Sequence, residues 1–100
     1  MVKHIVMWRL KEEAAGADKK RNAQLLKEKL EALHGQIPGL LKIELGINFA
    51  QSDNVSDVVL CTAFATQNDL NSYIVHPLHK AVGVFVREVV AERRMVDYCV

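Results

Sequence analysis

The spacing of the apolar residues alternates along this chain between two periods, in an order that matches few folds. Period-two alternation and short apolar runs predict four strands, over residues 2–10, 41–47, 57–64 and 92–100. Spacings of three and four predict a helix over 18–34, and a second helical region starts at Gln67, breaks at Pro77 and continues from Leu78 to about Val86. The resulting order of strand, helix, strand, strand, helix, strand is that of a ferredoxin-like α+β protomer (βαββαβ) with a four-stranded antiparallel sheet.

The helices of such a protomer can cover only one face of its sheet, so the other face is left open. The alternation of the first strand places His4, Val6 and Trp8 on the same side. We expect Val6 and Trp8 on the open face, together with one apolar side of the third strand, and a patch of that size usually marks an interface. We therefore predict a homodimer, a dimeric α/β barrel, whose sheets close face to face with His4 in the barrel interior and Val58 and Leu60 in the interface.

Composition narrows the class of protein further. A chain of 100 residues, half of them apolar, fits one domain over 1–100. The 13 basic and 12 acidic residues are scattered and leave a net charge of +1, which predicts no nucleic-acid partner and no membrane anchor. No apolar run approaches the roughly 20 residues that cross a bilayer. Cys61 and Cys99 form neither a disulfide framework nor a CxxC pair, so we expect a cytoplasmic protein.

The stretch YIVHPLHKAV, residues 73–82, is the main candidate for chemistry. It spaces Tyr73, His76 and His79 three residues apart around a proline. An imidazole with a pKa near neutrality can remove a proton from a carbon next to a carbonyl, and a tyrosine hydroxyl can polarise that carbonyl. The alternative is a structural corner, in which His76 caps a broken helix and His79 hydrogen-bonds to the first strand.

Two other kinds of site are less well supported by the sequence. His76 and His79 could offer two imidazoles to a metal ion, but the proline between them breaks the turn and no third ligand lies nearby, so we expect neither a metal nor a cofactor. Arg87, Arg93 and Arg94 could bind an anionic ligand, although arginines on a terminal strand are usually solvated or paired with acidic residues.

Five pieces of the chain, in this order, resemble a known family. They are VKHIV at Val2 to Val6, IPGLLKIELGIN at Ile37 to Asn48, the apolar third strand ending in Phe64, YIVHPLH at Tyr73 to His79, and VDY at Val96 to Tyr98. Over nearly its full length the chain resembles the stress-responsive dimeric α/β barrel family, called Dabb. The resemblance implies a ferredoxin-like protomer and a β-barrel homodimer, and many members of the family have no defined activity.

One branch of the family, the polyketide cyclases of the olivetolic acid cyclase type, suggests roles for particular residues. The chain is similar to these cyclases at Tyr73 and His79, where the equivalent residues serve as the acid/base pair, and His4 matches their first-strand histidine. The resemblance thus implies catalytic roles for these three residues. Around them we expect ligand-binding side chains from Trp8, Val6, His76 and Phe85.

Three functions follow as hypotheses. The first is a Dabb protein of undefined activity that binds a small apolar or carbonyl-containing molecule in a barrel cleft. The second is a cofactor-free cyclase or lyase, which requires a cavity of roughly 300 Å³ or more lined by His79 and Tyr73. The third is a monooxygenase, as in related dimeric barrel families, although no residue marks a haem axial ligand. A packed interior would favour a protein without turnover.

Overall fold

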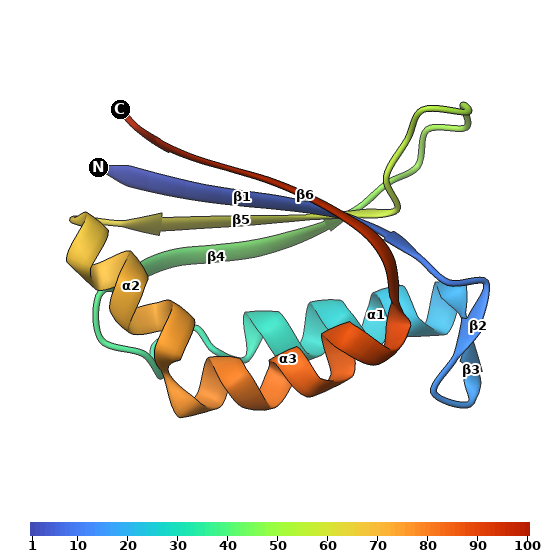
Figure 1. Ribbon diagram of the computed structural model, residues 1–100, viewed down its shortest axis with the longest axis horizontal. Helices are drawn as coiled ribbons and strands as arrows, with labels where there is room; N and C mark the ends of the chain where they lie inside the picture. Colours follow the sequence, from blue (N-terminus) through green and yellow to red (C-terminus); the bar gives the residue numbers. More distant parts are fainter.

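The computed structural model describes residues 1–100, and its main elements follow the predicted order (Figure 1). The strands of the main sheet are β1 (Val2–Leu10), β4 (Leu40–Ile47), β5 (Val58–Phe64) and β6 (Val90–Cys99), and the helices are α1 (Lys19–Glu31), α2 (Gln67–Val75) and α3 (Pro77–Val89). A short hairpin that the sequence did not predict, β2 (Glu13–Ala14) and β3 (Ala17–Asp18), precedes α1. Gly16 in its turn has a φ of +77°, a left-handed conformation that favours glycine.

The main sheet has the strand order β4-β5-β1-β6, and each neighbouring pair is antiparallel. This order confirms the predicted ferredoxin-like fold. Figure 1 shows the three helices on one face of the sheet, while the opposite face carries none. The sheet therefore has a covered face and an open face, as expected.

The covered face is made by the side of β1 that carries His4, Val6 and Trp8. These three side chains are at most 5% exposed and lie in or beside the main core, which also contains Leu26 of α1. The prediction that Val6 and Trp8 lie on the open face, with His4 in a barrel interior, was therefore wrong. Burial favours the side of β1 without charged residues, because the opposite side also carries Lys3 and Arg9.

The same correction applies to the third strand of the predicted fold. Val58 and Leu60 are 2% and 3% exposed and belong to the core beneath the helices, so neither is an interface position. Residues directly opposite one another in antiparallel strands share a face, and β1 pairs Ile5 with Cys61 and Val96, and Met7 with Val59. The open face accordingly presents an apolar centre made of Ile5, Met7, Val59, Cys61 and Val96.

Strand β4 follows the period-two pattern except near its start. Leu45 is fully buried, but Leu41 is 51% exposed. The pairing of β4 with β5 shifts register between Leu40 and Lys42, so that Leu41 lies at a bulge and Leu40 enters the core instead. A bulge changes which face a residue occupies, and period-two counting cannot detect it.

Side chains cap the start of each helix. Asp18 caps α1, and Thr66 caps α2 by accepting a 3.1 Å hydrogen bond from the Asp69 N–H. His76 lies between α2 and α3 in an extended conformation, and its Nδ1 accepts from the Leu78 N–H at 3.1 Å. The corner expected at the proline is therefore present, and His76 is its cap.

Helix α1 ends at Glu31, three residues before the predicted end at His34. The chain forms a tighter, 3₁₀-like turn here, because the N–H groups of Leu33 and His34 donate to carbonyls only three residues earlier. Gly35 follows with a φ of +76° and turns the chain away. None of the helices is both long and apolar enough to cross a bilayer.

Substitution of Leu26 by alanine is expected to destabilise the fold by about 2 to 5 kcal/mol, because this fully buried side chain leaves a cavity beneath the sheet. Thermal unfolding at a fixed protein concentration measures the effect. Leu78→Ala is the matched control, since Leu78 also lies in a helix but is 42% exposed, and it should change the stability by less than about 1 kcal/mol. Equal losses in both variants would contradict the assigned core.

Candidate functional site

One face of α3 forms the outer wall of a cavity. Pro77 suits the first turn of a helix, because its missing N–H has no partner there and its φ is already helical. From that start, spacings of three and four bring one stripe of side chains to face the sheet. The stripe consists of His79, Val82, Gly83, Val86 and Arg87.

The sheet and α1 supply the opposite wall. Arg93 of β6 is paired with Trp8 of β1, so it shares the covered face with His4 and Trp8. The residues on this wall are His4, Val6, Trp8, Leu30, Leu60 and Arg93. The space between the two walls is open on one side and measures about 230 Å³, below the roughly 300 Å³ expected for an enzyme pocket but above the roughly 150 Å³ of a cavity known to accept benzene. A ligand of this cavity would be small.

The helix break fixes the orientation of His79. In an unbroken helix the Ile74 carbonyl would accept from the Leu78 N–H, but that N–H donates to His76 instead. The free Ile74 oxygen lies 3.0 Å from Nδ1 of His79. A carbonyl can only accept, so Nδ1 donates its proton and the lone pair of the neutral ring is on Nε2. No protein group hydrogen-bonds Nε2, and His79 belongs to the cavity wall.

His79 is also held in its neutral, basic form. Burial lowers the pKa of His79 below its usual 6.5, and electrostatic interactions with His4, Arg93 and His76 lower it further. The hydrogen bond to the Ile74 carbonyl opposes these effects because it favours the protonated ring. The net direction is downward, so His79 is a base at neutral pH.

Tyr73 lies behind His79, with the two ring centroids 4.5 Å apart. Its side chain is fully buried and its hydroxyl has no hydrogen-bond partner in the protein. Burial raises the pKa of Tyr73 to about 12, so the hydroxyl stays protonated and can donate a hydrogen bond at neutral pH. A buried hydroxyl without a partner costs about 1 to 3 kcal/mol.

In an alkaline titration, the phenol of Tyr73 is expected to ionise at a higher pH than that of an ordinary tyrosine. Its folded pKa of about 12 lies above the usual value of 10.0, so the unfolded chain loses this proton first. The contribution of Tyr73 to the free energy of unfolding is therefore fully present below pH 10. As the pH rises to 12, this contribution of roughly 2 to 3 kcal/mol is lost. Phenolate absorbance and urea unfolding of the wild type and Tyr73→Phe measure both effects. The variant should lack the ionisation near pH 12. Identical curves for the two proteins would contradict the assignment of Tyr73 as a buried phenol.

His4 is anchored by a carboxylate that the sequence did not single out. Its Nδ1 is hydrogen-bonded to Asp97 Oδ1, and the two residues are paired across β1 and β6. The hydroxyl of Thr62, opposite His4 on β5, donates to the His4 carbonyl at 2.8 Å. His4 is thereby fixed 6.4 Å from the ring of Tyr73, measured between centroids. The cavity wall thus holds two imidazoles whose Nδ1 atoms are both already bonded.

The structure brings together some of the predicted site residues and separates others. His4, Val6, Trp8 and His79 line the cavity, and Tyr73 packs behind it. His76 and Phe85 are not among the lining residues. His79 bonds within its own corner and not to the first strand, which corrects the alternative set out above. No group of three or more His, Cys, Asp or Glu side chains is placed to hold a metal ion.

The fold and the cavity define a class, that of ferredoxin-like protomers with a small cavity between the sheet and the helix layer. The model of the Dabb family, the stress responsive A/B barrel domain, matches residues 2–100. This chain belongs to the Dabb family.

Solved structures agree with the fold. A dimeric protein of unknown function from Bacteroides fragilis is 31% identical, with 97% of this chain and 93% of that chain covered and a TM-score of 0.81. A Dabb family protein from Mesorhizobium loti is 25% identical, with 99% and 95% covered and a TM-score of 0.70. A hydroxynitrile lyase from Passiflora edulis is 14% identical, with 99% and 92% covered and a TM-score of 0.78, a likeness of fold alone. No curated protein matches the chain.

Proposed function

We propose that this Dabb protein binds a small carbonyl compound in the cavity between α3 and the sheet, and that His79 exchanges a proton with it. The observation that carries the proposal is the hydrogen bond from His79 Nδ1 to the Ile74 carbonyl, which leaves Nε2 as an unpartnered base on a cavity wall.

The chemistry is a proton transfer next to the carbonyl. Nε2 of His79 takes a proton from the α-carbon, the C–H electron pair forms the carbon–carbon double bond of the enolate, and the carbonyl π pair moves to oxygen. Tyr73 packs against the ring of His79 behind the cavity wall and, as a neutral buried phenol, helps to hold that ring in place. Return of the proton from Nε2 to the α-carbon, as the enolate π pair reforms the C–H bond and the carbonyl, completes the cycle. The imidazole both removes and returns the proton, so the reaction needs no cofactor.

Acetophenone is a suitable first probe, because it combines the size of a substituted benzene with one exchangeable methyl group next to the carbonyl. In D₂O near neutral pH we expect the protein to replace methyl protons by deuterium faster than buffer alone, as measured by proton NMR. The amide signals of Val82 and Gly83 should shift as the ligand binds. Shifts without exchange would identify a binding protein without turnover. If the millimolar ligand produced neither, the proposed function would be wrong.

We also propose that two copies pair through the open face of the sheet. Its apolar centre, defined above by Ile5, Met7, Val59, Cys61 and Val96, includes side chains that are up to 52% exposed. Figure 1 shows the loop between β4 and β5 rising beyond the sheet on the side away from the helices, and Phe49 in this loop is 97% exposed. The relative from Bacteroides fragilis is described as dimeric. Sedimentation should give twice the protomer mass of 11.2 kDa, and a monomer at micromolar concentration would contradict the pairing.

We also propose a cytoplasmic location, which the state of the cysteines supports. Cys61 and Cys99 are both unpaired in the fold, and Cys99 is exposed. Free thiols persist in reducing compartments, which supports a cytoplasmic location. Fractionation of cells that express the full chain tests this proposal.

A further inference from the structure

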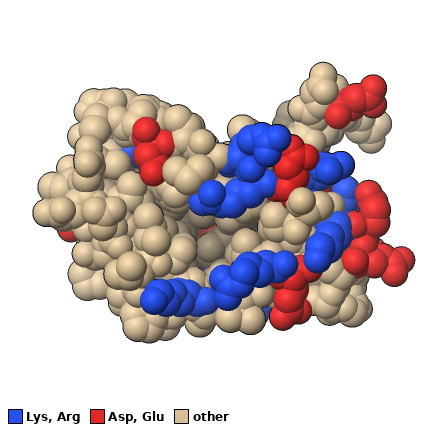
Figure 2. Space-filling view, viewed as in Figure 1, with Lys and Arg blue, Asp and Glu red and all other residues tan.

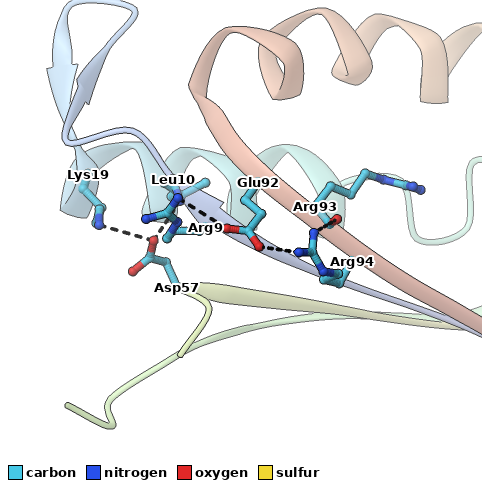
Figure 3. A network of polar contacts seen from close by, with 7 residues as sticks. All are labelled: Arg9, Leu10, Lys19, Asp57, Glu92, Arg93 and Arg94. Atoms are coloured by element: carbon cyan, nitrogen blue, oxygen red, sulfur yellow. Dashed lines mark hydrogen bonds and ion pairs between the residues drawn. The ribbon is translucent and has the colours of Figure 1, made fainter. Parts of the chain in front are cut away.

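Two arginines reach the same cavity from opposite walls. On α3, a guanidinium nitrogen of Arg87 lies 3.5 Å from the position that a Cβ would occupy at Gly83, so the side chain folds back along the helix toward the turn that follows His79. On β6, Arg93 occupies the covered face opposite Trp8. Figure 3 shows the Arg93 side chain extending away from the ion pairs of its neighbours.

Neither of these arginines has an acidic partner. The nearby cations are paired: Arg9 and Arg94 both contact Glu92, at 3.3 and 2.8 Å. No carboxylate lies within 4.0 Å of the guanidinium of Arg87 or Arg93, and no acidic residue lines the cavity. Figure 2 shows a recess on this side of the molecule with basic side chains along both of its edges.

We propose that the carbonyl compound bound in this cavity also carries a carboxylate, which Arg87 and Arg93 hold while the reacting carbon faces His79. This inference rests on the function proposed above and specifies its substrate class. A planar guanidinium matches a carboxylate through two parallel hydrogen bonds, which fixes orientation as well as charge. Arg87 and Arg93 are both exposed, and two unneutralised cations at the rim of a cavity also attract anions to its mouth.

The position of the arginines relative to His79 gives the carboxylate a defined place. Arg87 lies two helical turns beyond His79 on the same stripe of α3, and Arg93 is close enough to act on the charge of His79. The anion would therefore bind toward the C-terminal half of α3 and leave the carbonyl near the N-terminal half. A molecule with a carbonyl and a carboxylate on opposite sides of a small apolar body fits this arrangement.

The matched ligands are 4-acetylbenzoate and its neutral amide, 4-acetylbenzamide, which share shape and the exchangeable methyl group and differ in charge. Titrations followed by the amide signals of Val82 and Gly83 compare their affinities at low salt. We expect the wild type to bind the carboxylate at least about tenfold more tightly, a preference that falls severalfold in Arg87→Gln and in Arg93→Gln. Arg94→Gln is the control, because Arg94 pairs with Glu92 and lies opposite Met7 of the open face.

Each outcome decides the inference. Equal affinity for the two ligands, no detectable binding of either, or identical effects of Arg93→Gln and Arg94→Gln would overturn it. Methyl exchange is read separately from binding, so the two proposals can fail independently. If His79-dependent exchange occurs with the amide and the carboxylate has no advantage, only the anionic substrate class is wrong. If the carboxylate is preferred and no methyl exchange occurs, the anion site stands and proton transfer is wrong.

Discussion

Substitution of His79 by glutamine is expected to slow deuterium exchange into the bound carbonyl compound by about 100- to 10,000-fold, the usual contribution of a positioned general base. Glutamine can still donate to the Ile74 carbonyl, so the corner and its fold should persist. Ligand affinity should change far less than the exchange rate, since the side chain volume is nearly kept. Proton NMR of the methyl signal measures the rate, and amide shifts measure the affinity.

The control for this substitution is His34→Gln, at an exposed position after α1. It removes an imidazole without touching the cavity and should leave the exchange rate unchanged. The rate of the wild type should also rise with pH and level off near neutrality, because the pKa of His79 lies below 6.5 and only the neutral ring accepts a proton. An unaltered rate in His79→Gln would exclude this residue as the base.

The lowered pKa of His79 also makes the stability of the fold depend on pH. The unfolded chain binds a proton at this residue more readily than the folded chain does, so stability must fall as the pH drops below 6.5. His79→Gln should therefore lose less stability than the wild type in mild acid.

Substitution of Val96 by aspartate should dissociate the proposed dimer. Val96 is 52% exposed and lies opposite Ile5 on the open face. A pairing of two identical faces would bury two unpaired carboxylates, and at about 2 kcal/mol or more each the dissociation constant should rise by about a thousandfold. Sedimentation over a range of concentrations measures the shift.

Val84→Asp is the matched control for the dimer. Val84 is 53% exposed on α3, so the change in charge and in exposed surface is the same, but the position is on the helix layer. This variant should keep the mass of the wild type. If both variants remained dimeric, the interface would have to lie elsewhere, and if both became monomeric, the effect would not be specific to the open face.

The sequence correctly predicted which side chains of β1 share a face, but not which face of the sheet they occupy. Alternation along β1 placed His4, Val6 and Trp8 together, and the structure keeps them together, because successive side chains of a strand must alternate. Which side the helices cover depends on the sum of apolar surface over several strands. The interspersed Lys3 and Arg9 were the signal on β1 that favoured the opposite assignment.

The site was only partly predictable for a similar reason. The cap by His76 follows from residues adjacent in sequence, and so does the free Ile74 carbonyl once Pro77 breaks the helix. The bond between His4 and Asp97 joins residues 93 positions apart and depends on the register of β1 and β6. Neither spacing nor composition specifies that register.

The tautomer of His79 tests the central claim most directly. Long-range proton–nitrogen NMR of the imidazole at neutral pH distinguishes a protonated Nδ1 from a protonated Nε2. The structure predicts the proton on Nδ1, with a bare Nε2 whose nitrogen shift changes when acetophenone or 4-acetylbenzoate is added. A proton on Nε2, or an Nε2 signal that neither ligand alters, would contradict a cavity base at this position.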